Sequence, residues 1–187
     1  MMAIPLVLVL VATAVVAVVL AQVRIGSDRY QEIIQAKDLV ADVLPPPEYI
    51  VETHLTVNQL AVGAGDERAA VERIERLEQE FQTRHDVWVG SLSDPATRQA
   101  MLVDAYEPAQ EYFDVLNAEF LPALAAGDTE LMQELASGRL DELYSAHRAG
   151  VDEVVILATA AQADAEAAAA QDERRGSALL VDRKSVV

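Results

Sequence analysis

The chain has no cysteine, few aromatic residues and comparatively few basic residues. Without cysteine there is no disulfide framework and no thiolate chemistry. Aromatic residues are only 5% of the 187, and the alternation of apolar and polar residues that is typical of strands is nearly absent. Fourteen basic against 31 acidic residues give a net charge of −17, which argues against nucleic acid as a partner, because phosphate binding needs a basic surface.

Motifs for metal binding and catalysis are also lacking. The three histidines, His54, His85 and His147, are far apart and do not have the spacing of zinc ligands. His147 falls on an apolar seam, where we expect a core histidine with a satisfied hydrogen bond. No nucleophile motif, phosphate-binding glycine loop or Glu-x-x-His pair is visible. We therefore expect no metal, no cofactor and no enzymatic activity, with the many carboxylates on the solvent faces of helices.

The N-terminus carries the longest apolar run, MMAIPLVLVLVATAVVAVVLA, which contains no charged residue. About 20 apolar residues in a helix cross the hydrocarbon core of a bilayer, so we predict a transmembrane helix over residues 1–22. A signal peptide cleaved after Ala21 is the alternative. The run is longer than the apolar region of most signal peptides, and no basic segment precedes it.

The rest of the chain is rich in alanine and has the 3.6-residue periodicity of helices. We predict an all-α fold, an antiparallel up-down-up-down four-helix bundle over residues 23–175 with long first and last helices. Proline and glycine clusters mark the expected breaks between helices. The breaks are Pro45–Pro47, Gly63–Asp66, Gly90–Pro95 and Gly127–Thr129. Within the third helix, Pro108 and Pro122 should bend or loosen the backbone.

The C-terminal residues suggest an interrupted second span. Residues 176–181, GSALLV, follow a charged cluster and read as the start of a second transmembrane helix. Residues 182–187, DRKSVV, match what a common sequencing adapter encodes, so we expect them to be an artefact and the natural chain to continue. A genuine short polar tail is the alternative.

Three strings resemble bacterial chemoreceptors. They are KDLVADVLPPPEYIVE at 37–52, YEPAQEYF at 106–113 and VDEVVILA at 151–158. With the spans and the long helices, they make the chain similar to the sensory half of methyl-accepting chemotaxis proteins that have a four-helix-bundle ligand-binding domain. The resemblance implies a truncated receptor in the inner (cytoplasmic) membrane with its bundle in the periplasm. It also implies a homodimer, a small-molecule ligand, and contact with the chemotaxis kinase complex only through a missing cytoplasmic part.

The strongest candidate ligand site surrounds the proline cluster, because a broken helix frees backbone groups and can open a polar pocket. Its residues are Lys37, Pro45, Pro46, Pro47, Glu48, Tyr49 and Glu52. Lys37 could take a carboxylate or another small anion; alternatively the prolines form only a structural kink. A second cluster, Arg84, His85 and Trp88, could cap a ligand through a cation and an indole ring, or could simply pack at a helix end.

Other functions remain open from the residues alone. The same sensor could serve a histidine kinase or a cyclase, because a fold does not determine its output. The chain could instead be a single-span anchored helical scaffold without a ligand. Cleavage after Ala21 would make it a secreted helical binding protein.

Overall fold

The computed structural model describes Ile34 and residues 48–182 of the chain. Every regular element in that part is helical, which confirms the all-α fold class. The predicted membrane helix over residues 1–22 lies outside the described residues, as does the proline break at 45–47. None of the described helices has both the length and the apolar character needed to cross a membrane.

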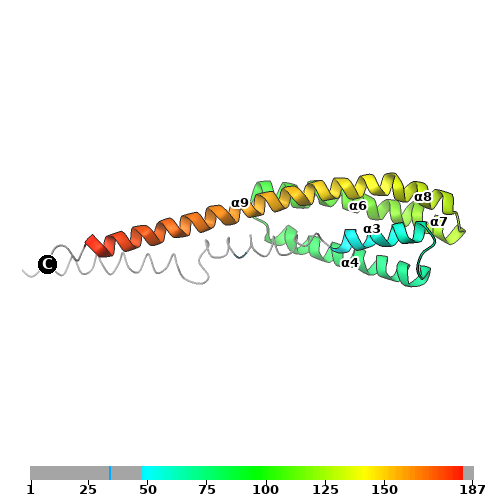
Figure 1. The fold of residues 1–187 in the computed structure, drawn as a ribbon, viewed down its shortest axis with the longest axis horizontal. Coiled ribbons are helices and arrows are strands. Elements are labelled where there is room, and N and C mark those ends of the chain that lie inside the picture. Colours follow the sequence, from blue (N-terminus) through cyan, green and yellow to red (C-terminus); the bar gives the residue numbers. More distant parts are fainter. Residues whose placement is uncertain (1–33, 35–47, 183–187) are drawn as a thin grey trace, which may run out of the picture. The chain divides into compact units, whose positions relative to one another are not determined.

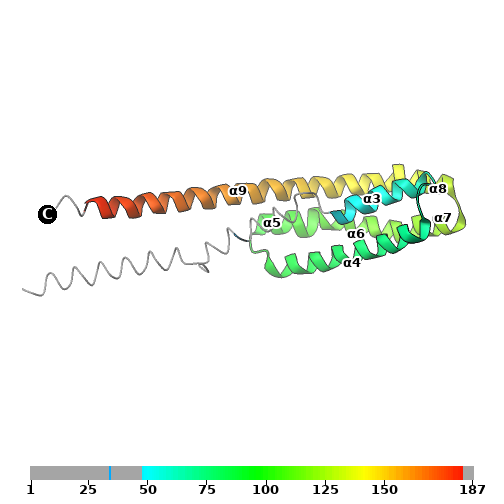
Figure 2. The same ribbon diagram turned by 60° about the horizontal axis from the view of Figure 1, so that its bottom comes forward.

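The chain divides into two compact units, and Val40–Ala158 is the larger. In it α3 packs against α4 and α8, and both views place α9 beside α6 (Figures 1 and 2). Its elements, with π-helical turns written η, are α3 (Glu48–Ala61), α4 (Glu67–Ser91), α5 (Pro95–Gln99), η1 (Ala100–Asp104), α6 (Tyr106–Val115), η2 (Leu116–Phe120), α7 (Leu121–Ala126), α8 (Thr129–Ser137) and the first part of α9 (Arg139–Asp182).

The core of this unit lies between α3, α4, α6–α8 and α9. Its largest fully buried side chains are Tyr112, Phe113, Phe120, Ile50, Ile74, Leu116 and Leu140. Four of these side chains, Tyr112, Phe113, Leu116 and Phe120, come from the third helical stretch. Tyrosine as a residue type is intermediate in burial, yet Tyr112 is completely buried.

The turns before α4 and α5 contain residues that are typical of helix ends. Gly63 and Gly65 adopt positive φ angles of 71° and 96° between α3 and α4, which glycine allows without strain. The Asp66 carboxylate then accepts a hydrogen bond from the Ala69 N–H at 3.0 Å and caps α4. Asp94 caps α5 in the same way, and Pro95 is the first residue of that helix.

Two π-helical turns precede the two prolines of the third helical stretch. In η1 the Ala105 N–H donates to the Ala100 carbonyl, and after η2 the Leu121 N–H donates to the Leu116 carbonyl. Pro108 and Pro122 have no N–H to donate to the carbonyl four residues earlier, and a proline ring clashes with that carbonyl in a regular helix. A wider π-helical turn reduces this clash. The loosening predicted at these prolines therefore takes the form of π-helical turns.

The last helical stretch differs from the prediction at Gly138. The sequence predicts no break after Gly127–Thr129, whereas the structure ends α8 at Ser137 and starts α9 at Arg139. Gly138 has φ −112° and ψ −103°, and a Cβ there would lie 2.8 Å from the Glu134 carbonyl oxygen. The predicted long last helix is confirmed by α9, which has 44 residues.

The second unit contains residues 1–39 and 159–187, of which Ile34 and residues 159–182 are described. Its described helix is the C-terminal part of α9, which is rich in alanine. Residues 176–181, the predicted start of a second span, are helical as part of α9. Residues 183–187 lie outside the described chain.

Candidate functional site

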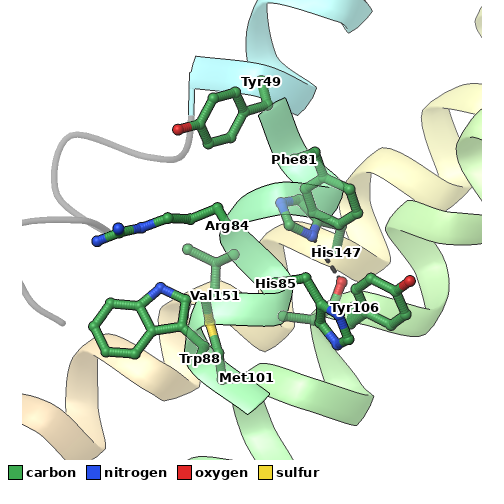
Figure 3. Close-up of a pocket in the computed structure, with 10 residues that line it drawn as sticks. Tyr49, Phe81, Arg84, His85, Trp88, Met101, Tyr106, His147 and Val151 are labelled. Atoms are coloured by element: carbon green, nitrogen blue, oxygen red, sulfur yellow. Dashed lines mark hydrogen bonds between the residues drawn. The ribbon is translucent and has the colours of Figure 1, made fainter. Parts of the chain in front are cut away.

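A small cavity lies within the Val40–Ala158 unit, where α3, α4, η1, α6 and α9 meet (Figure 3). Its free volume is about 40 Å³, enough for about three water-sized spheres. The described residues that line it are Tyr49, Phe81, Arg84, His85, Trp88, Met101, Ala105, Tyr106, His147 and Val151.

One face of α4 supplies a wall of the cavity. Phe81, His85 and Trp88 follow one another at steps of four and three residues, which places them on the same side of a helix. The Arg84 guanidinium carbon lies 5.1 Å from the centre of the Trp88 ring, within the range of a cation–π contact. The cluster Arg84–His85–Trp88, predicted as an alternative ligand site, is therefore brought to the cavity.

Trp88 carries an unsatisfied donor. The side chain is only 3% exposed, and its Nε1 is the one buried side-chain nitrogen or oxygen without a hydrogen-bond partner among the described residues. In Figure 3 this nitrogen is on the edge of the ring that faces Arg84 and Val151. A buried donor without a partner costs about 1–3 kcal/mol, so an acceptor brought to this edge would remove a penalty.

His147 closes the cavity from α9. Its Nδ1 lies 2.8 Å from the Ala105 carbonyl oxygen, which can only accept, so Nδ1 carries the proton and donates. Burial lowers the pKa of His147, opposed by the Ala105 hydrogen bond and assisted by the positive charge of Arg148. The neutral ring then has Nε2 as an acceptor. The prediction of a core histidine with a satisfied hydrogen bond is confirmed.

The backbones of α9 and η1 approach each other next to this bond. A Cβ at Gly150 would lie 2.5 Å from Ala105 N and 2.6 Å from its Cα, distances that real Cβ atoms do not tolerate. Glycine is therefore required here by packing. Together with the His147–Ala105 bond, this contact ties α9 to the end of the π-helical turn.

The opposite wall is held by a polar network around Tyr106. The Tyr106 hydroxyl lies 2.9 Å from the Gln82 Oε1 and 3.0 Å from the Gln110 Oε1, and the two glutamines also bond to each other. The His85 ring stacks on Tyr106 with 3.6 Å between centres. Burial lowers the pKa of His85, against the raising effect of Asp86. These contacts hold both rings in place.

Tyr49 and Arg84 also line an open hollow of about 420 Å³ outside the cavity. The hollow's other described residues are Arg76, Gln79, Glu80, Thr83 and Val87. Because the two spaces share Tyr49 and Arg84, movement of these two side chains would connect the cavity to the hollow. Both are only partly buried, and Figure 3 shows them on the same side of the cavity.

The predicted site around the prolines is only partly visible. Lys37, Pro45, Pro46 and Pro47 lie outside the described residues, and Glu48 begins α3. Tyr49 lines the cavity, whereas Glu52, half-buried on α3, is not among the lining residues.

Five lining residues were not among the predicted site residues: Phe81, Met101, Ala105, Tyr106 and Val151. His147 was predicted as a core residue without a link to Trp88. The helical spacing of these residues marks each as facing inward. Which residues of different helices meet depends on the register between those helices, which periodicity does not give.

No group of three or more His, Cys, Asp or Glu residues that could hold a metal ion occurs in the described part of the chain. Comparisons with family models, with curated proteins and with solved structures found no match. The function is therefore inferred from the fold and the cavity.

Proposed function

We propose that this chain is the sensory part of a transmembrane receptor of the chemoreceptor type. In this proposal Val40–Ala158 belongs to an antiparallel up-down-up-down four-helix bundle in the bacterial periplasm, anchored in the inner membrane by residues 1–22. The bundle binds a small molecule and works as a homodimer. A signalling domain outside these 187 residues receives the signal.

The cavity and its position on α9 are the observation that supports this proposal most strongly. His147 and Val151 of α9 form part of the cavity wall, and the same helix continues to Asp182, past the predicted start of a second span at 176–181. A ligand that fits one packing of α9 better than another shifts the population between the two.

The lining of the cavity suits a binding role. No carboxylate is among the described lining residues, and most of them are apolar or aromatic. The deep burial of Trp88 and His147 suits recognition of a small ligand.

Sequencing the genomic DNA through codon 181 and beyond tests the receptor proposal. We expect the frame to continue into a complete apolar span and then into helices with glutamate- and glutamine-rich heptads. A histidine kinase or cyclase domain in that place would keep the sensor and replace the chemotaxis output. A genomic frame that stops after Val187 would contradict the receptor proposal and favour an anchored scaffold.

A further inference from the structure

The outer face of α3 has no charged residue. It consists of Leu55, Asn58, Gln59 and Val62, the last of these one residue past the end of the helix. Leu55 and Val62 are 56% and 72% exposed, whereas Ile50 and Val57 on the inner face, which packs against α4 and α8, are completely buried. A surface helix normally has charged residues on the side that faces solvent, so exposed Leu and Val on an uncharged face point to a partner that covers it.

Charge distinguishes α3 from its neighbour α4. Over residues 53–65 the sequence THLTVNQLAVGAG contains no Asp, Glu, Lys or Arg. Its one histidine, His54, is neutral at pH 7 because burial lowers its pKa below the ordinary value of 6.5. The outer face of α4, by contrast, has exposed charged residues such as Glu72, Arg73 and Glu75. The uncharged surface is therefore a property of α3 and the turn that follows it, and α4 does not share it.

The net charge of the chain favours a second copy at this face. Each copy carries a net charge of −17, so two copies repel each other unless the surfaces that meet are free of charge. The outer face of α3 meets this condition. Leu55, Asn58 and Val62 follow one another at steps of three and four residues, which is the spacing of a seam between two helices. An asparagine within such a seam can fix the register of the two helices.

The area of the face is small. A helix of 14 residues is about 21 Å long, so a strip about 10 Å wide offers about 200 Å² per copy. Stable interfaces bury about 800 Å² per partner. The contact therefore needs both copies to be held in one membrane, where anchoring raises the effective concentration of one copy at the other.

We propose that the outer face of α3 is the contact between two copies of this chain in the membrane. The two copies are related by a two-fold axis that passes next to the face, so Leu55 and Val62 of one copy meet the same residues of the other copy. This inference rests on the anchored homodimer proposed above, and it names the surface through which that homodimer forms.

Cysteine cross-linking locates the contact, because the chain has no cysteine of its own. The full chain with either Leu55→Cys or Val62→Cys is placed in liposomes at a low ratio of protein to lipid and is oxidised mildly. We expect both variants to form disulfide-linked dimers at least about tenfold faster than Glu75→Cys, a change at an exposed position on α4. Equal rates at the three positions, or no dimer at either α3 position, would overturn the proposal.

Charges placed on the face test its symmetry. Leu55→Lys and Leu55→Glu each put like charges on both copies, so each alone should slow the cross-linking of Val62→Cys at least about tenfold. An equal mixture of the two should recover the dimers that contain one copy of each, because Lys and Glu then face each other. Glu75→Lys changes the charge away from the face and is the matched control, which should cross-link at the original rate. Cross-linking that neither Leu55 variant slows, with helical content retained by circular dichroism, would contradict the proposal.

Two further results separate this contact from its alternatives. A Leu55→Cys thiol that reacts slowly with a water-soluble maleimide, although no cross-linked dimer forms, would mean that something other than a second copy covers the face, and would overturn the proposal. The receptor function has its own test in the genomic sequence. Absence of cross-links in a chain whose frame continues into a second span would overturn the contact and leave the receptor standing. Cross-links in a chain whose frame stops after Val187 would support the contact and contradict the receptor.

Discussion

Two clusters of histidine and aromatic rings occupy the Val40–Ala158 unit, and they differ in how completely their polar atoms are satisfied. In the first, the His54 ring stacks on Tyr144 with 4.2 Å between centres and a 4° angle. Its Nε2 lies 3.5 Å from the Asp141 carboxylate, and its Nδ1 lies 3.4 Å from the Tyr112 hydroxyl. Both ring nitrogens of His54 therefore have a polar neighbour.

The second cluster, around Trp88, has a cavity and one buried N–H without a partner. Its other members are fixed: His147 bonds to Ala105, and Tyr106 bonds to two glutamines. In the Trp88 cluster the side chains of His147 and Tyr106 are therefore hydrogen-bonded, and the Trp88 N–H is not. This contrast indicates that the His54 cluster serves stability and that the Trp88 cluster has space for a ligand.

The largest effect is expected at the helix contact below the cavity. Gly150→Ala places a Cβ within 2.5 Å of Ala105 N and forces α9 away from η1, so we expect a loss of about 1–3 kcal/mol in the free energy of unfolding. Urea denaturation followed by circular dichroism measures it. Gly90→Ala is the control, because its Cβ would meet nothing within 4 Å in α4, and should stabilise by about 0.5–1 kcal/mol. Equal effects would refute the close contact.

Breaking the His54 cluster should cost less. Tyr112→Phe removes the hydroxyl next to His54 Nδ1, and we expect a loss of about 0.5–1.5 kcal/mol in the same denaturation experiment. The same variant leaves the Trp88 fluorescence spectrum unchanged. No loss of stability would mean that the 3.4 Å contact contributes nothing and that the contrast between the clusters is weaker than described.

Filling the cavity should raise stability. Val151→Ile adds one methylene to a lining residue, and a buried methylene contributes about 0.8 kcal/mol. Val154→Ile is the matched control on the same helix: Val154 is fully buried and is not a lining residue, so the added group should destabilise. If both variants destabilise, the cavity is not available to an added group.

The pH dependence gives the smallest expected signal. Burial lowers the pKa of His147 in the folded chain below its ordinary value of 6.5, so the unfolded chain binds protons more readily. Stability is therefore full above pH 6.5 and falls as the pH drops from there toward the lowered pKa. Burial lowers the pKa values of His54 and His85 as well, and both contribute in the same direction.

His147→Gln isolates the contribution of His147, because glutamine can donate to the Ala105 carbonyl without titrating. Melting temperatures between pH 7.5 and 5.5 should fall less steeply in this variant than in the wild type. Identical slopes would mean that His147 does not titrate differently in the folded and unfolded chains.

Much of the local structure follows from single residues. The breaks predicted at Gly63–Asp66 and Gly90–Pro95 lie between helices in the structure, and the prolines at 108 and 122 coincide with wider turns. These signals involve neighbours within a few residues, and a sequence states them directly. The split at Gly138 was not predicted, because a glycine inside a helical pattern weakens a helix without fixing whether it breaks.

The candidate site was only partly predictable, because it joins distant positions. The cluster Arg84–His85–Trp88 was predicted because its three residues are close together in one helix. Tyr49 was predicted for a different site, around the prolines. The meeting of Trp88 with His147 and Val151 depends on the close approach at Gly150, which looks in the sequence like a weak point of α9. Only the position of the Ala105 backbone shows that packing requires glycine at position 150.

The indole N–H of Trp88 tests the central claim most directly. The chain has a single tryptophan, so an isotope-labelled sample of the full chain in micelles gives one indole N–H signal in a proton–nitrogen correlation spectrum. If the indole N–H lacks an acceptor, its proton signal should lie upfield of that of free tryptophan in water, where the N–H is hydrogen-bonded. A signal at or downfield of the free-tryptophan position would contradict the account of the Trp88 cluster as the one with an unsatisfied donor.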